Sequence, residues 1–228
     1  MSKKIHRFRI DTIPQGNHIT ITEERLVHQL NRVLRLTAGE EIILFCHEGI
    51  DTVFCITDIN AKGILLTLVR THTVTQPTHT LIAAIGIPKG DAFELIVQKL
   101  TEIGVSEIVP LITSRTVKQS VRVDRLQAIS DEALEQSGGT RRVLIREPIS
   151  LTTALETYPY QSVYFDTDTT KKHTLEKTAT MIMYIGPEGG WSPEDAAVLA
   201  NKSTPATLGP RVFRTETAAI IGAYTLLW

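Results

Sequence analysis

The stretch MIMYIGPEGGWSPEDA, residues 181–196, contains a complete change of secondary structure and decides the fold that we expect. Its first five residues are apolar and typical of a buried strand, and a glycine-rich turn, Gly186–Gly190, follows at once. Ser192 is then a predicted N-cap and Pro193 a predicted first helical residue, so a helix begins here. A turn between a buried strand and a helix lies where open α/β sheets bind their ligands.

The chain from Leu81 onward repeats this alternation of strands and helices. Predicted strands are Leu81–Ile87, Glu107–Ile112, Val143–Arg146, Ser162–Phe165 and Thr180–Ile185, with the end of another at Ala206–Gly209. Predicted helices are Asp91–Ile103, capped by Asp91 and stopped by Gly104, then Val123–Gln136, a short helix from Ser150, the helix from Ser192, and Thr215–Trp228. The alternation predicts a parallel sheet with helices on both faces. The terminal helix is apolar nearly all round, so we expect it to be buried.

Residues 1–70 predict a different unit, built mostly of short strands. The expected strands are His18–Thr22, Glu41–Phe45, Val53–Ile59 and Ile64–Val69, around one helix at Glu23–Arg35. Short strands with a single helix favour a small β-barrel. Thr71–Thr80 has no apolar run and contains Gln76-Pro77, which makes it the expected linker. The predicted division is therefore 1–72 and 73–228.

Composition limits the class of protein. Of 228 residues 42% are apolar and 21% charged, and the formal net charge is −1, so a nucleic-acid partner must be met by a local basic patch. The two cysteines show no metal-ligand spacing, and no apolar run approaches the ~20 residues that span a bilayer. The N-terminus has no apolar signal-peptide core. We expect a cytoplasmic protein with no metal and no membrane segment.

A basic stripe is predicted on the helix Glu23–Arg35. At about 100° per residue, one side of this helix carries Leu26, Val27, Leu30, Val33 and Leu34. The RNA-binding candidates are Arg25, His28, Arg32 and Arg35 on the opposite side, with Lys3, Lys4, Arg7 and Arg9 near them in sequence. Such a stripe favours contact with an RNA backbone. An ordinary solvated helix face is the alternative.

Two loops near the end of the chain carry the candidate ligand site. Gly186–Gly190 lacks the GxGxxG spacing and has no Walker lysine, and its neighbouring acids suit ribose hydroxyls or a cationic ligand better than phosphate. Pro210–Arg214 places two arginines before a helix N-terminus, which is typical of an anion or nucleotide site. A tight structural turn and a surface Arg214–Glu216 pair are the alternatives.

Several segments together point to a known family. They are His6–Phe8, His28–Leu36, Lys89–Val105, Ser114-Arg115, Glu135–Gly138, Gly186–Gly190 and Leu208–Ala219. On these segments the chain resembles, nearly from end to end, the RsmE-type small-subunit (16S) ribosomal RNA uridine-N3 methyltransferases of the SPOUT, or trefoil-knot, superfamily. GPEGG followed by LGPRVFRTET at the end of the chain is the most specific part of the resemblance.

The resemblance implies a fold, a cofactor and partners. Residues 1–72 would be a PUA-like RNA-binding barrel, and 73–228 a methyltransferase domain with a C-terminal knot. S-adenosyl-L-methionine would be the cofactor, ribosomal RNA in the small subunit the substrate, and a homodimer the working unit. The implied cofactor-binding residues are Gly186, Glu188, Gly189, Gly190, Leu208, Gly209, Val212 and Phe213. The loop after Ser162–Phe165 is a candidate third wall.

Catalysis at uridine N3 needs a proton removed and the resulting anion stabilised. Arg214 is the expected electrostatic partner, and Glu216 the expected base or the residue that orients Arg214. Arg115 and Glu135 are the second candidates. The chain departs from the family at Gly139, where the family usually has arginine after Glu-Gln-Ser/Cys-Gly, and Arg141 and Arg142 follow instead.

Three other functions stay open on the sequence. The first is an RNA-binding protein without catalysis, against which the intact GPEGG and RTET segments argue. The second is a dinucleotide-dependent oxidoreductase, which would need GxGxxG where the chain has Ile87–Asp91. The third is a related methyltransferase that acts on another base or another RNA.

Overall fold

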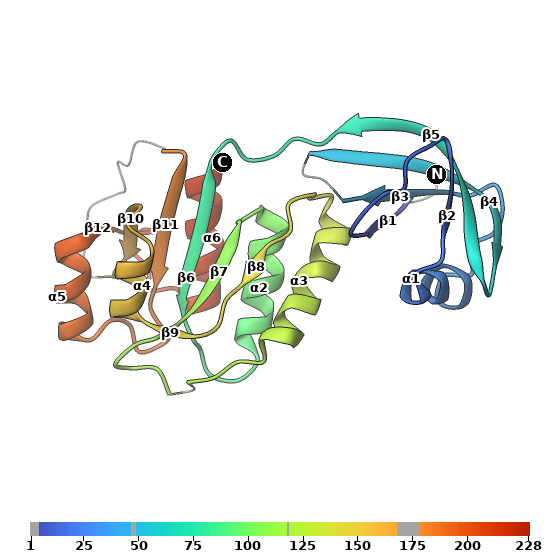
Figure 1. Ribbon diagram of the computed structural model, residues 1–228. Coiled ribbons are helices and arrows are strands. Elements are labelled where there is room, and N and C mark those ends of the chain that lie inside the picture. Colours follow the sequence, from blue (N-terminus) through green and yellow to red (C-terminus); the bar gives the residue numbers. More distant parts are fainter. Residues whose placement is uncertain (1–4, 47–48, 118, 168–177) are drawn as a thin grey trace. The chain divides into compact units, whose positions relative to one another are not determined.

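The computed structural model describes residues 5–46, 49–117, 119–167 and 178–228, and it falls into two compact units (Figure 1). Unit 1 comprises Met1–Gln76 together with Glu135–Arg141, and unit 2 comprises Pro77–Leu134 and Arg142–Trp228. Within this described part of the chain, every helix is too short or too polar to cross a bilayer.

Unit 1 is built on a five-stranded sheet in the order β1-β3-β4-β5-β2. The strands are β1 His6–Arg9, β2 His18–Ile21, β3 Glu41–Phe45, β4 Ile50–Asn60 and β5 Gly63–Thr73. β1 pairs with β3 in parallel, and the other pairs are antiparallel. The sequence patterns missed β1, and β5 continues to Thr73, into the stretch expected to be a linker.

The helix of unit 1 differs from the expected one because it changes type. It is α-helical over α1, Glu24–His28, and π-helical over η1, Gln29–Val33. The wider π turn takes more residues per turn, so positions after His28 rotate away from the α-helical pattern. Val33, expected in the apolar face, is therefore 63% exposed, a correction to the prediction. Arg35 ends the segment with a φ of 53°, in the left-handed region.

Unit 2 contains a seven-stranded sheet in the order β12-β10-β11-β6-β7-β8, with β9 paired to β7. The strands are β6 Thr80–Gly86, β7 Glu107–Ile112, β8 Leu144–Ile145, β9 Ile149–Ser150, β10 Gln161–Phe165, β11 Thr180–Ile185 and β12 Thr204–Ala206. The strand pairs of this sheet among the described residues are parallel, which confirms the predicted parallel α/β arrangement.

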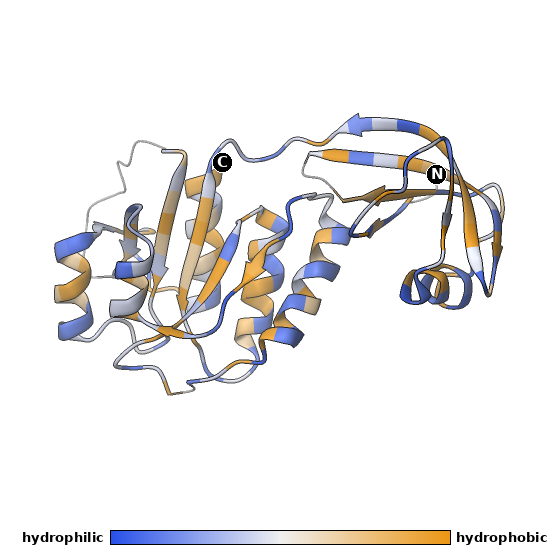
Figure 2. Ribbon diagram, viewed as in Figure 1, coloured by the Kyte–Doolittle hydropathy of each residue, from blue (hydrophilic) through white to orange (hydrophobic). Residues whose placement is uncertain are grey.

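Helices cover both faces of this sheet (Figure 1). The helices are α2 Ala92–Ile103, α3 Val123–Ser137, α4 Leu151–Thr157, α5 Pro193–Lys202 and α6 Thr215–Leu227. Alternate residues of β6 point to opposite faces, with Leu81 and Ala83 packed in the core beneath α2 and α6, and Ile82 and Ala84 in the core beneath α4 and α5. The central strands are accordingly largely apolar (Figure 2).

Three helix ends test the local signals in the sequence. Ser192 and Asp195 form a complete capping box at the start of α5, as Ser192-Pro193 predicted. Gly104 ends α2 with a φ of 101°, which confirms the predicted stop. Asp91 stands at the N-cap of α2 but its side chain makes no capping hydrogen bond, so that part of the prediction is wrong.

Helix α6 is buried against the middle of the sheet. It packs on α2, β6 and β11, although β12, the strand before it, lies at the sheet edge. A Cβ at Gly222 would lie 2.9 Å from Cε2 of Phe165, so the absence of a side chain lets the helix approach β10. The expected burial of the apolar terminal helix is confirmed, with Ala219, Ala223 and Leu226 in the core.

Candidate functional site

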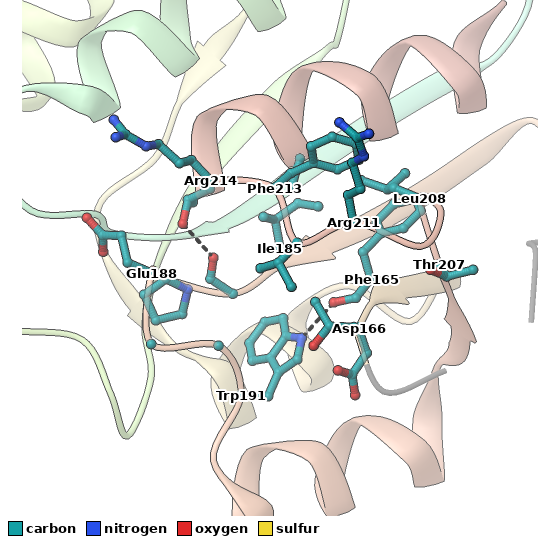
Figure 3. A pocket seen from close by; sticks show the side chains of 18 of the residues that line it. Phe165, Asp166, Ile185, Glu188, Trp191, Thr207, Leu208, Arg211, Phe213 and Arg214 are labelled. Atoms are coloured by element: carbon teal, nitrogen blue, oxygen red, sulfur yellow. Dashed lines mark hydrogen bonds between the residues drawn. The ribbon is translucent and has the colours of Figure 1, made fainter. Parts of the chain in front are cut away.

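A cavity of about 520 Å³ lies at the carboxyl ends of β10, β11 and β12, entirely within unit 2 (Figure 3). Its lining comes from four loops: the loop after β7, the end of β10, the glycine-rich turn after β11, and the loop between β12 and α6. The lining residues are Arg115, Phe165–Thr167, Ile185–Trp191, Thr207–Gly209, Arg211–Thr215 and Ala218. Figure 3 shows Trp191 and Asp166 on one side of the cavity and Arg211, Phe213 and Arg214 on the other.

The glycine-rich turn lies very close to the end of β6. A Cβ at Gly86 would be 2.5 Å from the backbone nitrogen of Pro187, so only glycine allows this crossing. The turn closes with a hydrogen bond from the Gly190 amide to the Pro187 carbonyl, at 2.8 Å, and Gly190 has a φ of 67°. The hydroxyl of Thr215, the first residue of α6, donates to the Gly186 carbonyl at 3.3 Å.

Trp191 joins the glycine-rich turn to β10. Its indole Nε1–H donates to the Phe165 carbonyl at 2.9 Å, the hydrogen bond drawn beside Trp191 in Figure 3. The indole also covers Gly186, where a Cβ would lie 3.3 Å from the ring. Trp191 therefore sets the distance between two walls of the cavity.

A second link runs from the loop after β7. Arg115 donates from Nη1 to the Gly189 carbonyl at 2.5 Å, and its aliphatic stem packs against Gly189. The buried carboxylate of Asp195 accepts from both the amide and the hydroxyl of Ser114, at 3.2 and 3.1 Å. Asp195 also closes the capping box of α5, so one side chain holds a helix start and the Arg115 loop together.

Charged groups near the turn are held by backbone and side-chain donors. The Glu188 carboxylate accepts from the Lys89 amide at 2.7 Å, which ties the turn to the segment before α2. A hydrogen bond from its own backbone lowers the pKa of Glu194, helped by the Ser192 hydroxyl and the charge of Arg115. Glu194 is fully exposed, so this pKa shift adds nothing measurable to stability.

The loop between β12 and α6 forms the opposite wall. The Thr207 hydroxyl accepts from the Gly209 amide and donates to the Gly209 carbonyl, both at 3.1 Å. Gly209 has a φ of 127°, which favours glycine. The Val212 side chain is 80% exposed although this residue lines the cavity. Arg214 is the N-cap of α6.

The structure brings most of the predicted ligand residues together. All eight predicted cofactor-binding residues line the cavity, and so do Arg115 and Arg214. Glu216, in the first turn of α6, is half-buried and is not among the lining residues. Glu135 does not line the cavity either: it belongs to unit 1, where its carboxylate accepts from the Arg9 amide at 3.0 Å.

The predicted RNA-binding residues of unit 1 fall into different environments. Arg7 is a correction: its side chain is 10% exposed, forms an ion pair with Asp51 at 2.7 Å and lies over the Phe45 ring, so it cannot serve a ligand. Arg9 pairs with Asp11, and Arg25 with Glu23. His28, Arg32 and Arg35 are exposed. Lys3 and Lys4 lie outside the described residues.

Sequence reasoning missed several lining residues. These are Phe165, Asp166, Thr167, Ile185, Pro187, Trp191, Thr207, Thr215 and Ala218. The first three form the third wall, which was expected from the loop after Ser162–Phe165 but could not be assigned by residue. Most of the other missed residues are adjacent in sequence to a predicted site residue. The sequence signal that could have found them is their position directly after a predicted strand.

Comparisons with known proteins agree with this site. A sequence profile described as an RNA methyltransferase domain matches residues 75–227. The chain is 28% identical to ribosomal RNA small subunit methyltransferase E of Rickettsia conorii, over 95% of this chain and 93% of the relative. It is 26% identical to the Bacillus subtilis protein of the same name, over 91% and 89%.

A solved structure extends the likeness to three dimensions. The ribosomal RNA small subunit methyltransferase E of Neisseria gonorrhoeae, solved with bound S-adenosyl methionine, superposes with a TM-score of 0.89 at 26% identity, covering 99% of this chain and 98% of that one. The profile matches about two thirds of this chain, so the chain belongs to the RNA methyltransferase domain family. Within that family it is similar to the proteins named ribosomal RNA small subunit methyltransferase E.

Proposed function

We propose that this protein methylates N3 of a uridine in small-subunit (16S) ribosomal RNA, with S-adenosyl-L-methionine as methyl donor. The observation that carries the proposal is that residues of Gly186–Gly190 and Leu208–Phe213 line the same cavity. These two segments are also the most specific part of the chain's resemblance to the family. The relative from Neisseria gonorrhoeae holds S-adenosyl methionine in the same overall fold.

The lining residues fit this cofactor. A volume of about 520 Å³ lies within the range of small-molecule sites. Ile185, Leu208 and Phe213 offer apolar surface to an adenine, and backbone groups around Gly190 and Gly209 stand free of side chains. The carboxylates of Asp166 and Glu188 suit the ribose hydroxyls and the positive charge of a sulfonium. When bound, this cofactor supplies an electrophilic methyl group.

Arg214 is the residue proposed to act on the uracil. Removal of the N3 proton leaves negative charge on the flanking carbonyl oxygens, which a guanidinium stabilises. Arg214 lines the cavity and stands at the start of α6, whereas Glu216 does not reach the lining. We therefore propose that a water or a lining carboxylate accepts the proton. Glu216 and Arg214 form no ion pair among the described residues, so the proposed role of Glu216 in orienting Arg214 is a contact that forms only when the RNA is bound.

The remaining features of the family are part of the same proposal. A threaded, knotted C-terminus is supported by α6, which returns from edge strand β12 to pack on β6 and β11 in the middle of the sheet. Unit 1 is proposed to be a PUA-like barrel that binds RNA, supported by the exposed His28, Arg32 and Arg35. A homodimer in the cytoplasm is the proposed working form.

The test is methyl transfer from labelled cofactor to assembled small ribosomal subunits and to naked ribosomal RNA, followed by nucleoside analysis. We expect label on N3-methyluridine. Label on a ribose 2′-hydroxyl or on another base would keep the family and overturn the reaction. Cofactor binding by calorimetry without any transfer would favour the RNA-binding protein that lacks catalysis.

A further inference from the structure

The loop between β12 and α6 has two faces with different surroundings. Arg211, Val212, Phe213 and Arg214 all line the cavity, yet three of their side chains are exposed and Phe213 is half-buried. Val212, at 80%, is the most exposed of the large apolar residues in the described part of the chain. Figure 3 shows the guanidinium groups of Arg211 and Arg214 directed away from Trp191. The loop therefore offers its side chains to a partner at the mouth of the cavity.

The arginines of this loop also differ from most other exposed arginines of the protein. The arginines at the surface that pair with carboxylates are Arg25, Arg70, Arg125, Arg142 and Arg146, in the described residues. Arg211 and Arg214 form no ion pair in that same part of the chain, and Glu216 does not pair with Arg214. Two uncompensated guanidinium groups beside an exposed valine are a surface for an anion that also has an apolar part.

We propose that the side chains of Arg211 and Val212 receive the RNA strand at the cavity mouth, with Arg211 on a backbone phosphate next to the target nucleotide. The inference rests on the proposed function and extends it to the substrate. A base inside a folded RNA must leave its stack to enter a cavity, and its flanking phosphates then lie at the rim. A guanidinium binds two oxygens of a phosphate through two parallel N–H···O hydrogen bonds. An exposed apolar side chain can pack on the sugar or the base beside it.

The backbone and the side chains of the loop then have separate partners. Backbone groups of Leu208–Phe213 face the proposed cofactor, while Arg211 and Val212 face the RNA. This division predicts that changes at Arg211 alter RNA binding and leave the cofactor site intact. Charge complementarity favours a polyanion over the same loop of a second copy, because a symmetric contact would set the unpaired Arg211 and Arg214 of one loop against those of the other.

The test uses the full-length protein with Arg211→Gln, with Arg211→Lys as the charge-retaining variant and Arg122→Gln as the matched control. Arg122 is an exposed arginine of unit 2, next to α3, that does not line the cavity. Affinity for a ribosomal RNA fragment is measured between 50 and 200 mM salt, cofactor affinity by calorimetry, and mass by light scattering. We expect Arg211→Gln to weaken RNA binding about tenfold and to reduce the salt slope by about one.

Arg211→Lys is expected to recover most of the RNA affinity. Arg122→Gln is expected to bind RNA as the wild type does. All variants are expected to bind cofactor within about twofold of the wild type, since the backbone of the loop is unchanged. If Arg211→Gln binds RNA with the affinity and the salt slope of the wild type, the inference is overturned. The proposed function still stands in that case, provided that the wild type methylates RNA. A change in mass for Arg211→Gln overturns the inference too, by showing that the loop contacts a second copy. A wild type that binds neither cofactor nor RNA removes the proposed function, and the inference with it.

Discussion

Arg115 is the residue for which sequence and structure give different roles. The resemblance to the family made Arg115 a second catalytic candidate, but its guanidinium donates to the Gly189 carbonyl at 2.5 Å. A group committed to the turn positions the cofactor wall and is not available to the uracil. Ser114, fastened to Asp195, holds the same loop.

We expect Arg115→Ala to lower cofactor affinity about tenfold, in line with the loss of one charge-assisted hydrogen bond of about 1.5 kcal/mol. The single-turnover rate at saturating cofactor should stay near that of the wild type, because a positioning role disappears once the site is full. Ser114→Ala should change affinity in the same direction and less. A large loss in the single-turnover rate with unchanged affinity would return Arg115 to the chemical step.

Arg214 and Glu216 carry the opposite expectation. Removing one electrostatic partner of a developing anion costs about 10²–10³ in rate, so Arg214→Ala should lose that factor in single-turnover methylation with cofactor affinity nearly unchanged. Glu216→Gln should lose about tenfold, because it only misorients Arg214. Near-normal turnover in both variants would show that neither residue takes part in the reaction.

At the scale of elements, the close contact between α6 and β10 depends on Gly222. In an exposed helix Gly→Ala stabilises by about 1 kcal/mol, but here the new Cβ would lie 2.9 Å from the ring of Phe165, which lines the cavity. Overpacking of a core costs about 1–3 kcal/mol, so Gly222→Ala should lower the free energy of unfolding in urea and weaken cofactor binding. Thr225→Ala, on the exposed side of α6, is the control: it should leave cofactor binding unchanged and raise the free energy of unfolding by about 0.5 kcal/mol at most. A more stable Gly222→Ala protein would mean that the ring moves aside freely.

The α1–η1 helix shows how one local change of helix type alters a predicted surface. The pattern at 100° per residue placed Val33 inside, and the π turn exposes it beside Arg32. The arginines Arg32 and Arg35 remain exposed, so the basic surface survives with a different neighbour.

At the scale of the whole molecule, both compact units are expected to bind the same RNA. The double variant Arg32→Glu with Arg35→Glu should weaken binding to a ribosomal RNA fragment and flatten its dependence on salt, because two positive charges become negative. Cofactor affinity should be unchanged, since the cavity lies entirely in unit 2. Filter binding at several salt concentrations and calorimetry make the comparison. RNA affinity equal to that of the wild type would make this surface an ordinary solvated helix face.

The sequence by itself determined the features that depend on neighbours along the chain. Periodicity placed β7 and β11 to the residue, and Ser192 and Gly104 marked helix ends, because caps and turns are formed within a few residues. The two segments that line the cavity were predicted as a ligand site from glycine, strand and helix signals and from the family resemblance that they carry.

Only the tertiary structure decided which distant residues meet. Three contacts join segments that are far apart in sequence. They are the hydrogen bond from Trp191 to Phe165, the hydrogen bond from Arg115 to Gly189, and the buried ion pair of Arg7 with Asp51. No local pattern encodes them, since side-chain pairing across a fold depends on packing and on which buried charge finds a partner. The sequence and its family resemblance predicted that GPEGG and LGPRVF form one pocket, and the crossing at Gly86 and the return of α6 are the tertiary features that bring the two loops together.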